Sequence, residues 1–188
     1  MVLCEMDLEL EDDRPRYLPE ICCGVSKSFL NLLLDHLPAD GSLVLSIGCG
    51  SGMLEALLHR NARNAGRPLE LYGVEVPSCH VQYLSPEKVL RVSGTREMHS
   101  AAMLATTLLF VYPRKPELFA SYMNNYIHGA LEQVIWIGPS SDWQDNEHAL
   151  TRAFTDVKVW QGSEAGLPSY ELMAVASLPE ATVANSPS

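Results

Sequence analysis

Three glycines at alternate positions, Gly48, Gly50 and Gly52, are the residues whose spacing most directly indicates chemistry. They follow the aliphatic run LVLSI and precede a helical pattern, MLEALLHRNARNA. Glycine adopts a positive φ and leaves its backbone open to direct contact with a ligand. The first turn of a helix adds exposed N–H groups and the positive end of a dipole. The stretch therefore predicts a ligand-binding loop between a strand and a helix.

An acidic residue, Glu75, stands at the end of the next predicted strand, LELYGVEV, which Pro77 cuts off. An ionised carboxylate has two acceptor oxygens and can take hydrogen bonds from a vicinal diol. The alternative is an exposed charge at the end of a strand. The carboxyl ends of parallel strands are where α/β sheets bind ligands, so we expect Glu75 to join the glycine loop in one site.

Two familiar phosphate-binding loops do not match the glycine stretch. A dinucleotide fingerprint, GxGxxG/A, would place its last small residue at Met53 or Glu55, and neither permits close packing of the helix. A Walker phosphate loop needs a following Gly-Lys-Ser/Thr, which this chain lacks. The pattern that remains is GxGxG.

The segment VLSIGCGSGMLEALL, followed by YGVEV, resembles the cofactor region of the class I S-adenosylmethionine-dependent methyltransferases. The resemblance extends over roughly residues 20 to 178. It implies that the glycines pass under the methionyl part of S-adenosylmethionine and that Glu75 bonds both ribose hydroxyls. It also implies a loop over the adenine after the third strand. The cofactor-binding residues implied in this way are Ser46, Gly48, Cys49, Gly50, Gly52, Glu75, Val76, Gly94 and Thr95.

One position departs from the family pattern. The family usually carries Asp or Glu two residues before the first glycine, and this chain has Ser46. A hydroxyl can accept a hydrogen bond, but it cannot balance the positive charge of the ammonium or sulfonium group of the cofactor. The departure leaves open a non-catalytic protein that keeps the methyltransferase fold.

The loop after the predicted fourth strand, FVYPRKPE, is where the family lines its acceptor pocket. The Asp/Asn-Pro-Pro-Tyr signature of amino methyltransferases is absent there. Tyr112 is a catalytic candidate that could face the methyl group or stack on an acceptor, or it could simply pack against a helix. Arg114 and Lys115 could bind a substrate carboxylate or phosphate, or could lie in a solvated loop.

The segment PSSDW follows the predicted fifth strand and supplies two further candidates. Methyl transfer is an in-line displacement, so a protein base is needed only if the acceptor arrives protonated. Asp142 could act as that base, or could cap the next helix. Trp143 could form a wall of the substrate pocket.

The spacing of apolar residues, together with the Gly and Pro residues that end helices and strands, predicts the elements that must hold these residues. Only a short connection joins the last two strands, so they should form an antiparallel hairpin. The prediction is an α/β fold with a seven-stranded, mostly parallel sheet, helices on both faces and a C-terminal antiparallel hairpin. The expected helices are 26–37, 53–65, 116–130 and 145–154, the last capped by Asp145 or Asn146, and the expected strands are 43–47, 69–76, 89–92, 105–112, 131–138, 156–160 and 170–178.

Composition limits the partners of the chain. Its net charge is −10, with 13 basic and 23 acidic residues, which argues against nucleic acid and favours a small uncharged or cationic substrate. Five cysteines show no CxxC spacing, so neither a metal site nor a disulfide framework is expected. The start of the chain lacks the pattern of a secretory signal and no apolar run reaches the length of a bilayer span, so we expect a cytoplasmic protein without a membrane partner.

These observations predict an acidic N-terminal segment at residues 1–19, one methyltransferase-like domain at 20–178 and a polar tail at 179–188. The predicted function is S-adenosylmethionine-dependent methylation of a small molecule. The alternative is a binding or assembly module with the same fold, and a nicotinamide-dependent reductase is disfavoured by Met53. The roof of the pocket would come from the N-terminal residues or from a second copy of the chain in a homodimer.

Overall fold

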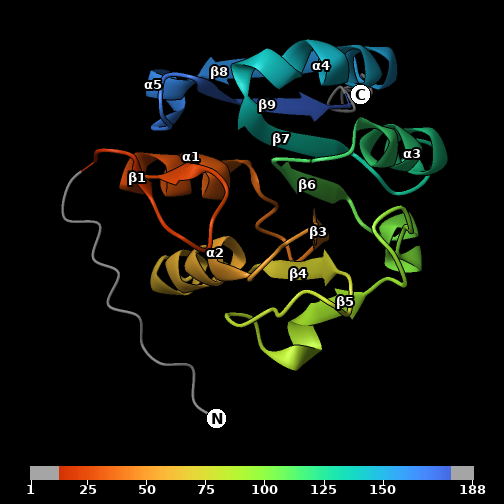
Figure 1. The fold of residues 1–188 in the computed structure, drawn as a ribbon, viewed down its shortest axis with the longest axis horizontal. Coiled ribbons are helices and arrows are strands. Elements are labelled where there is room, and N and C mark those ends of the chain that lie inside the picture. The colour runs from red at the N-terminus through yellow and green to blue at the C-terminus, as the bar shows by residue number, and fades with distance from the viewer. Residues whose placement is uncertain (1–12, 179–188) are drawn as a thin grey trace, which may run out of the picture.

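The computed structural model of the chain describes residues 13–178, which form a twisted sheet with helices on both faces (Figure 1). The sheet has seven strands in the order β5-β4-β3-β6-β7-β9-β8. Its first five strands in that order are parallel, and β9 runs antiparallel to both β7 and β8. The predicted fold class is therefore confirmed. The strands are β3 (Leu43–Ile47), β4 (Glu70–Glu75), β5 (Val89–Arg91), β6 (Thr107–Val111), β7 (Gln133–Pro139), β8 (Asp156–Gln161) and β9 (Glu171–Ser177).

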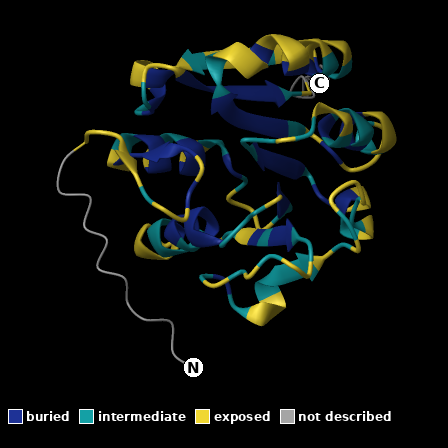
Figure 2. Cartoon of the chain, in the orientation of Figure 1, coloured by how far each residue is buried: buried dark blue, intermediate teal, exposed yellow. Residues whose placement is uncertain are grey.

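Two hydrophobic clusters lie on opposite faces of the sheet. Helices α1 and α2 pack their apolar residues into one cluster, and α3 and α4 pack theirs into the other. Figure 2 shows the consequence, with the central strands buried and the outer surfaces of the helices exposed. The helices are α1 (Lys27–His36), α2 (Met53–Asn64), η1 (Pro86–Lys88), η2 (Ser100–Met103), α3 (Pro116–Tyr126), α4 (Ser140–Ala153) and α5 (Gly162–Ala165).

Strand β3 is the point at which the strand order reverses. The chain passes from β3 outward to β4 and β5, then returns to the other side of β3 as β6. The register pairs Ile47 with both Val74 and Phe110, so the residues that follow these three strands reach the same edge of the sheet. A crevice at such a reversal is the usual ligand site of an open α/β sheet.

A second, two-stranded sheet was not predicted. Strand β1 (Arg16–Tyr17) pairs antiparallel with β2 (Gly24–Val25), which leads into α1. The carboxylate of Glu171, at the start of β9, accepts hydrogen bonds from the backbone N–H of Gly24 at 3.1 Å and from the hydroxyl of Tyr17 at 3.2 Å. This small sheet is therefore anchored to the main sheet, while the domain boundaries expected at 19 and 179 stay predictions.

Two helix boundaries differ by several residues from those expected, and one short helix was not predicted. Helix α4 begins at Ser140, directly after β7, so the predicted cap at Asp145 or Asn146 was wrong and both residues lie inside the helix. The earlier start brings Trp143 and Asn146 into the buried side of the first turns. Helix α3 ends at Tyr126, four residues before its expected end at residue 130. The connection between β8 and β9 contains α5, which begins with a capping box.

Replacement of Glu171 tests the anchor between the two sheets. Glu171 is fully buried, and Glu171→Ala would leave the N–H of Gly24 without its acceptor. We expect the variant to lose about 1–3 kcal/mol of unfolding free energy, the usual cost of an unsatisfied buried donor. Denaturant titration measures the change, with exposed Glu132→Ala as the matched control. Equal stability of the two variants would show that Glu171 is not an anchor.

Candidate active site

The glycine loop turns sharply between β3 and α2. Its three glycines all have positive φ, at 76°, 56° and 79° for Gly48, Gly50 and Gly52. A Cβ atom on Gly48 or Gly50 would meet nothing within 4 Å, whereas one on Gly52 would lie 2.9 Å from side-chain carbons of Leu84 and Val81. The first two glycines therefore leave their backbone open, and the third permits close packing under the start of α2.

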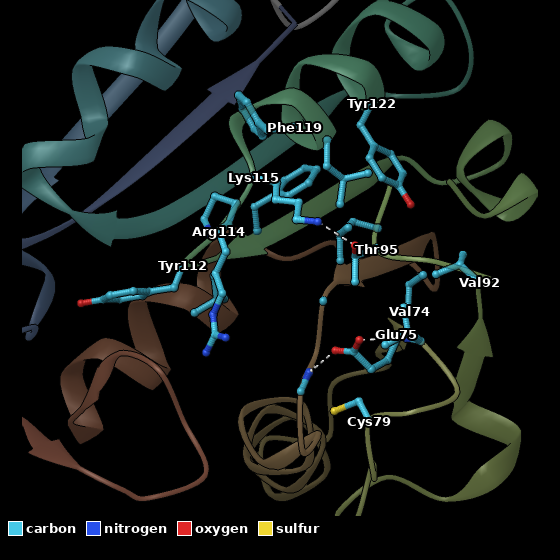
Figure 3. Close-up of a pocket in the computed structure, with 18 of the residues that line it drawn as sticks. Val74, Glu75, Cys79, Val92, Thr95, Tyr112, Arg114, Lys115, Phe119 and Tyr122 are labelled. Atoms are coloured by element: carbon cyan, nitrogen blue, oxygen red, sulfur yellow. Dashed lines mark hydrogen bonds between the residues drawn. The ribbon is translucent and has the colours of Figure 1, made fainter. Parts of the chain in front are cut away.

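The carboxylate of Glu75 lies against this loop. Its Oε2 accepts the backbone N–H of Gly50 at 2.9 Å, and its Oε1 accepts the N–H of Val76 at 2.8 Å (Figure 3). Each carboxylate oxygen keeps a lone pair beyond the one that these bonds use. Glu75 is thus fixed in orientation by two backbone donors while it retains acceptor capacity towards the adjoining cavity.

A cavity of about 450 Å³ opens beside the loop and Glu75. It reaches from the carboxyl ends of β3, β4 and β5 across to the loop after β6 and to α3. The structure brings together most of the predicted site residues in its lining. These are Gly48, Gly50, Glu75, Val76, Gly94, Thr95, Tyr112, Arg114 and Lys115.

Aromatic side chains of α3 form one wall of this cavity, and they were not predicted. Phe119 meets Phe110 edge to face at 4.9 Å between ring centroids, and Tyr122 meets the same ring at 5.6 Å. The Tyr122 hydroxyl accepts the N–H of His99 at 3.3 Å, and burial raises the pKa of Tyr122 to about 12. The i, i+3 spacing of these aromatics after the fourth parallel strand was the signal available in the sequence.

Two segments of the lining are joined directly across the cavity. The ammonium of Lys115 donates to the hydroxyl of Thr95 at 2.8 Å (Figure 3). This bond links the loop after β5 to the loop after β6. The apolar residues Val74, Val76 and Val92 also line the cavity, and such a lining suits a flat apolar group.

Tyr112 marks the end of β6 with an unusual backbone. Its φ of 51° lies in the left-handed region, which costs a non-glycine residue roughly 1–3 kcal/mol. Its N–H donates to the carbonyl of Ile137 at 2.7 Å, and its hydroxyl donates to Glu171 at 2.5 Å. Burial, and then the bond to Glu171, raise the pKa of Tyr112. Tyr112 lines the cavity, and Figure 3 shows its hydroxyl pointing away from Glu75.

Arg114 follows this turn and reaches back over the cavity. Figure 3 places its guanidinium between Tyr112 and the glycine loop. Within residues 13–178 it has no ion-pair partner in the structure. Cys22, from the connection between β1 and β2, also lines the cavity. The hydroxyl of Ser51 holds that connection by donating to the carbonyl of Glu20 at 2.9 Å.

Several predicted site residues lie elsewhere. Trp143 is 8% exposed and packs against Trp136, with ring centroids 5.4 Å apart, in the core between α4 and the sheet. Asp142 lies exposed in the first turn of α4 and accepts the hydroxyl of Ser141. The sulfur of Cys49 packs against Gly73, where a Cβ would lie 2.4 Å from it. None of these side chains lines the cavity, so the structure does not bring them to the site.

Beneath the glycine loop the structure contains an unexpected pair, Ser46 and Glu55. Both are buried, with Glu55 only 2% exposed, and the Ser46 hydroxyl donates to Oε1 of Glu55 at 2.6 Å. The other oxygen, Oε2, has no hydrogen-bond partner within the described chain. Burial raises the pKa of Glu55 to about 7, although the bond from Ser46 lowers it. The sequence signal for the burial of Glu55 was its place on the apolar face of α2, with Leu58 and Ala62.

Two negative findings concern residues 13–178. No group of His, Cys, Asp and Glu side chains there could hold a metal ion. No helix in that range has the length and apolar character needed to cross a bilayer.

Comparison with known proteins adds evidence on the fold. No protein-family model matches the chain, and no curated protein matches it. Among solved structures, it is similar to an S-adenosylmethionine-dependent O-methyltransferase from Thermotoga maritima, with 15% identity and a TM-score of 0.58 over 82% of this chain and 66% of that one. It is also similar to the pyocyanin biosynthetic protein PhzM, with 16% identity and a TM-score of 0.56.

Coverage of these proteins is uneven. The chain spans about half of PhzM, with 80% of this chain and 54% of that one covered. A methyltransferase from Mesorhizobium loti is covered over 97% of its length, with 12% identity and a TM-score of 0.53. These likenesses confirm that the chain has the fold of the class I S-adenosylmethionine-dependent methyltransferases.

The buried carboxylate gives a pH-dependent stability. Between about pH 4.5 and 7 the unfolded chain releases the Glu55 proton that the folded chain keeps, so unfolding free energy falls as the pH rises. Glu55→Gln removes this cost. We expect the variant to gain about 1–3 kcal/mol relative to the parent on going from pH 4.5 to pH 8.

Denaturant titrations of both proteins at the two pH values measure this gain. The matched control is Glu147→Gln, an exposed glutamate on α4. A difference between parent and Glu55→Gln that does not change with pH, as in the control, would contradict a buried carboxylate with a raised pKa.

Proposed function

We propose that the chain is an S-adenosylmethionine-dependent methyltransferase that acts on a small molecule. The observation that carries the proposal is the Glu75 carboxylate, held by the N–H groups of Gly50 and Val76 beside a cavity onto which two open glycines face. Such an arrangement accepts a ribose diol next to a bare backbone. The likeness in fold supports the same class of reaction.

The residues present fit this cofactor. Glu75 offers acceptors for two hydroxyls, and the backbone at Gly48 and Gly50 is open to the amino-acid arm. The apolar lining, which includes Val76 and Phe119, suits a flat base. The unpartnered Oε2 of Glu55 and the acid Glu75 supply negative charge near a cationic ligand. When bound, S-adenosylmethionine would supply an electrophilic methyl group on its sulfonium sulfur, with the neutral thioether S-adenosylhomocysteine as the leaving group.

The acceptor side of the proposed site consists of the loop after β6. Tyr112 forms a wall, and Arg114 reaches over the space above the glycine loop. The raised pKa of Tyr112 and its bond to Glu171 keep its hydroxyl protonated, so we assign it to positioning the acceptor and not to removing a proton. Alignment and exclusion of water are then the main contributions of the chain to rate.

A second candidate function is a non-catalytic binding protein with the same fold. It is favoured by Ser46, which stands where the family usually has an acid, and by the engaged hydroxyl of Tyr112. Both candidates bind the nucleoside, so binding alone does not separate them. Transfer of a labelled methyl group to any member of a panel of phenols, carboxylic acids and amines supports the enzyme; tight binding without transfer favours the second candidate.

The proposed setting of the protein follows from its charge. The net charge of −10 disfavours a nucleic-acid acceptor and supports a small molecule. We place the protein in the cytoplasm, because its cysteines lack the pattern of a secreted disulfide framework.

Glu75→Ala tests the ribose assignment. We expect the variant to bind S-adenosylhomocysteine more weakly by about 1–3 kcal/mol, because a charge-assisted hydrogen bond is lost. Isothermal titration calorimetry measures the affinity, with NADH as the competing nucleotide. Glu70→Ala, at the opposite end of the same strand and outside the cavity, is the control. An unchanged affinity in Glu75→Ala, or preference of the parent protein for NADH, would overturn the proposed function.

A further inference from the structure

We propose that Glu55 of helix α2 supplies the carboxylate that pairs with the ammonium group of the S-adenosyl amino acid. It would do so from beside Ser46, where the strand itself carries no acid. This inference rests on the proposed function and adds a specific residue to it. It concerns the amino-acid arm of the ligand, which is chemically separate from the nucleoside held by Glu75.

The carboxylate of Glu55 lies next to the end of β3. Ser46 lies two residues before Gly48, at the end of β3, and its hydroxyl donates to Oε1 of Glu55 at 2.6 Å. A carboxylate therefore lies within one hydrogen bond of the side chain at position 46. An aspartate or glutamate at that position would place its own carboxylate in much the same region. The chain has an acid there after all, contributed by the helix instead of the strand.

One oxygen of the Glu55 carboxylate lacks a hydrogen-bond partner in the described part of the chain. Glu55 is 2% exposed, and its Oε2 accepts no hydrogen bond in the described part of the chain. The groups that act on its pKa are its own burial, the Ser46 hydroxyl, its own backbone and Glu75, and no cation is among them. A buried carboxylate without a counter-charge is costly, so a protein that retains one gains something from it in another state. A bound cation would complete the pair.

The residues around Glu55 include members of the glycine loop and of the connection between β1 and β2. Glu55 acts electrostatically on Cys49, within the glycine loop, and on Cys23. Cys22, the neighbour of Cys23, lines the cavity, as do Gly48 and Gly50 of the loop. Glu55 is therefore close to the glycine loop and to the connection that carries Cys22, directly beneath the lining of the cavity and not within it. This is the end of the site where the open backbone would receive an amino-acid arm.

A purely structural role for the Ser46–Glu55 pair makes different predictions. A structural pair would hold the loop in place and affect every ligand of the cavity alike. A charge partner affects only ligands that carry the ammonium group. Two probes separate these roles: S-adenosylhomocysteine has the amino-acid arm, and 5′-methylthioadenosine has the same nucleoside without it.

The experiment is calorimetry of both probes with the parent protein and Glu55→Gln at pH 8. We expect Glu55→Gln to bind S-adenosylhomocysteine roughly 10-fold to 100-fold more weakly, the loss of one charge-assisted hydrogen bond, and 5′-methylthioadenosine within about twofold of the parent. For the parent, affinity for S-adenosylhomocysteine should fall between pH 8 and pH 6 while affinity for 5′-methylthioadenosine does not, because protonated Glu55 carries no charge.

A second variant moves the acid back to the strand. Glu55→Ser should lose affinity for S-adenosylhomocysteine, and the double variant Ser46→Asp/Glu55→Ser should regain it, because the carboxylate then lies on β3. This exchange also shows that any loss in the single variant does not come from misfolding. Thermal unfolding of each variant is measured alongside.

The outcomes distinguish the two proposals. If the ratio of the two affinities is the same in Glu55→Gln as in the parent, or the exchange does not restore binding, the Glu55 assignment is wrong while the nucleoside site stands. If neither probe binds the parent protein, the proposed function fails, and the assignment of Glu55 fails with it.

Discussion

The site depends on one interaction, the pair of hydrogen bonds that the Gly50 and Val76 amides donate to the carboxylate of Glu75. The bond from Gly50 joins the loop after β3 to the end of the neighbouring parallel strand β4, and the bond from Val76 fixes the carboxylate locally. Because a carboxylate bound by two backbone donors cannot rotate freely, its remaining lone pairs face the cavity in a fixed direction. The positive φ of Gly48 and Gly50 leaves their backbone open beside this carboxylate, because a Cβ at either position would meet only open space.

Two other carboxylates are buried around this site, and they differ in how they are satisfied. Glu171 accepts bonds from the β1–β2 sheet and from Tyr112, and thereby fixes both the small sheet and the loop after β6. Glu55 accepts one bond and leaves an oxygen unpartnered within the described chain. A satisfied buried acid organises structure, whereas an unsatisfied one is retained at a cost to stability. Because of this contrast, we assign a structural role to Glu171 and propose that Glu55 binds a ligand.

The sequence predicted what depends on local pattern. The periodicity of apolar residues predicted the seven strands and the C-terminal hairpin. The glycine spacing and Glu75 predicted residues that meet at one edge of the sheet, because these features lie within single elements or at their ends. It failed where a residue's role depends on distant packing. Trp143 was expected in a pocket but packs on Trp136 because α4 begins at Ser140. The place of Glu55 on the apolar face of α2 indicates burial, but its pairing with Ser46 depends on contact between two elements.

The central claim is that this cavity holds an adenosyl nucleoside by its ribose. A crystal structure of the protein grown with S-adenosylhomocysteine tests it most directly. The account predicts the nucleoside in the cavity, both ribose hydroxyls within hydrogen-bond distance of the Glu75 carboxylate and the amino-acid arm along Gly48 and Gly50. A nucleoside bound elsewhere, or a cavity without nucleoside at saturating concentration, would contradict the account.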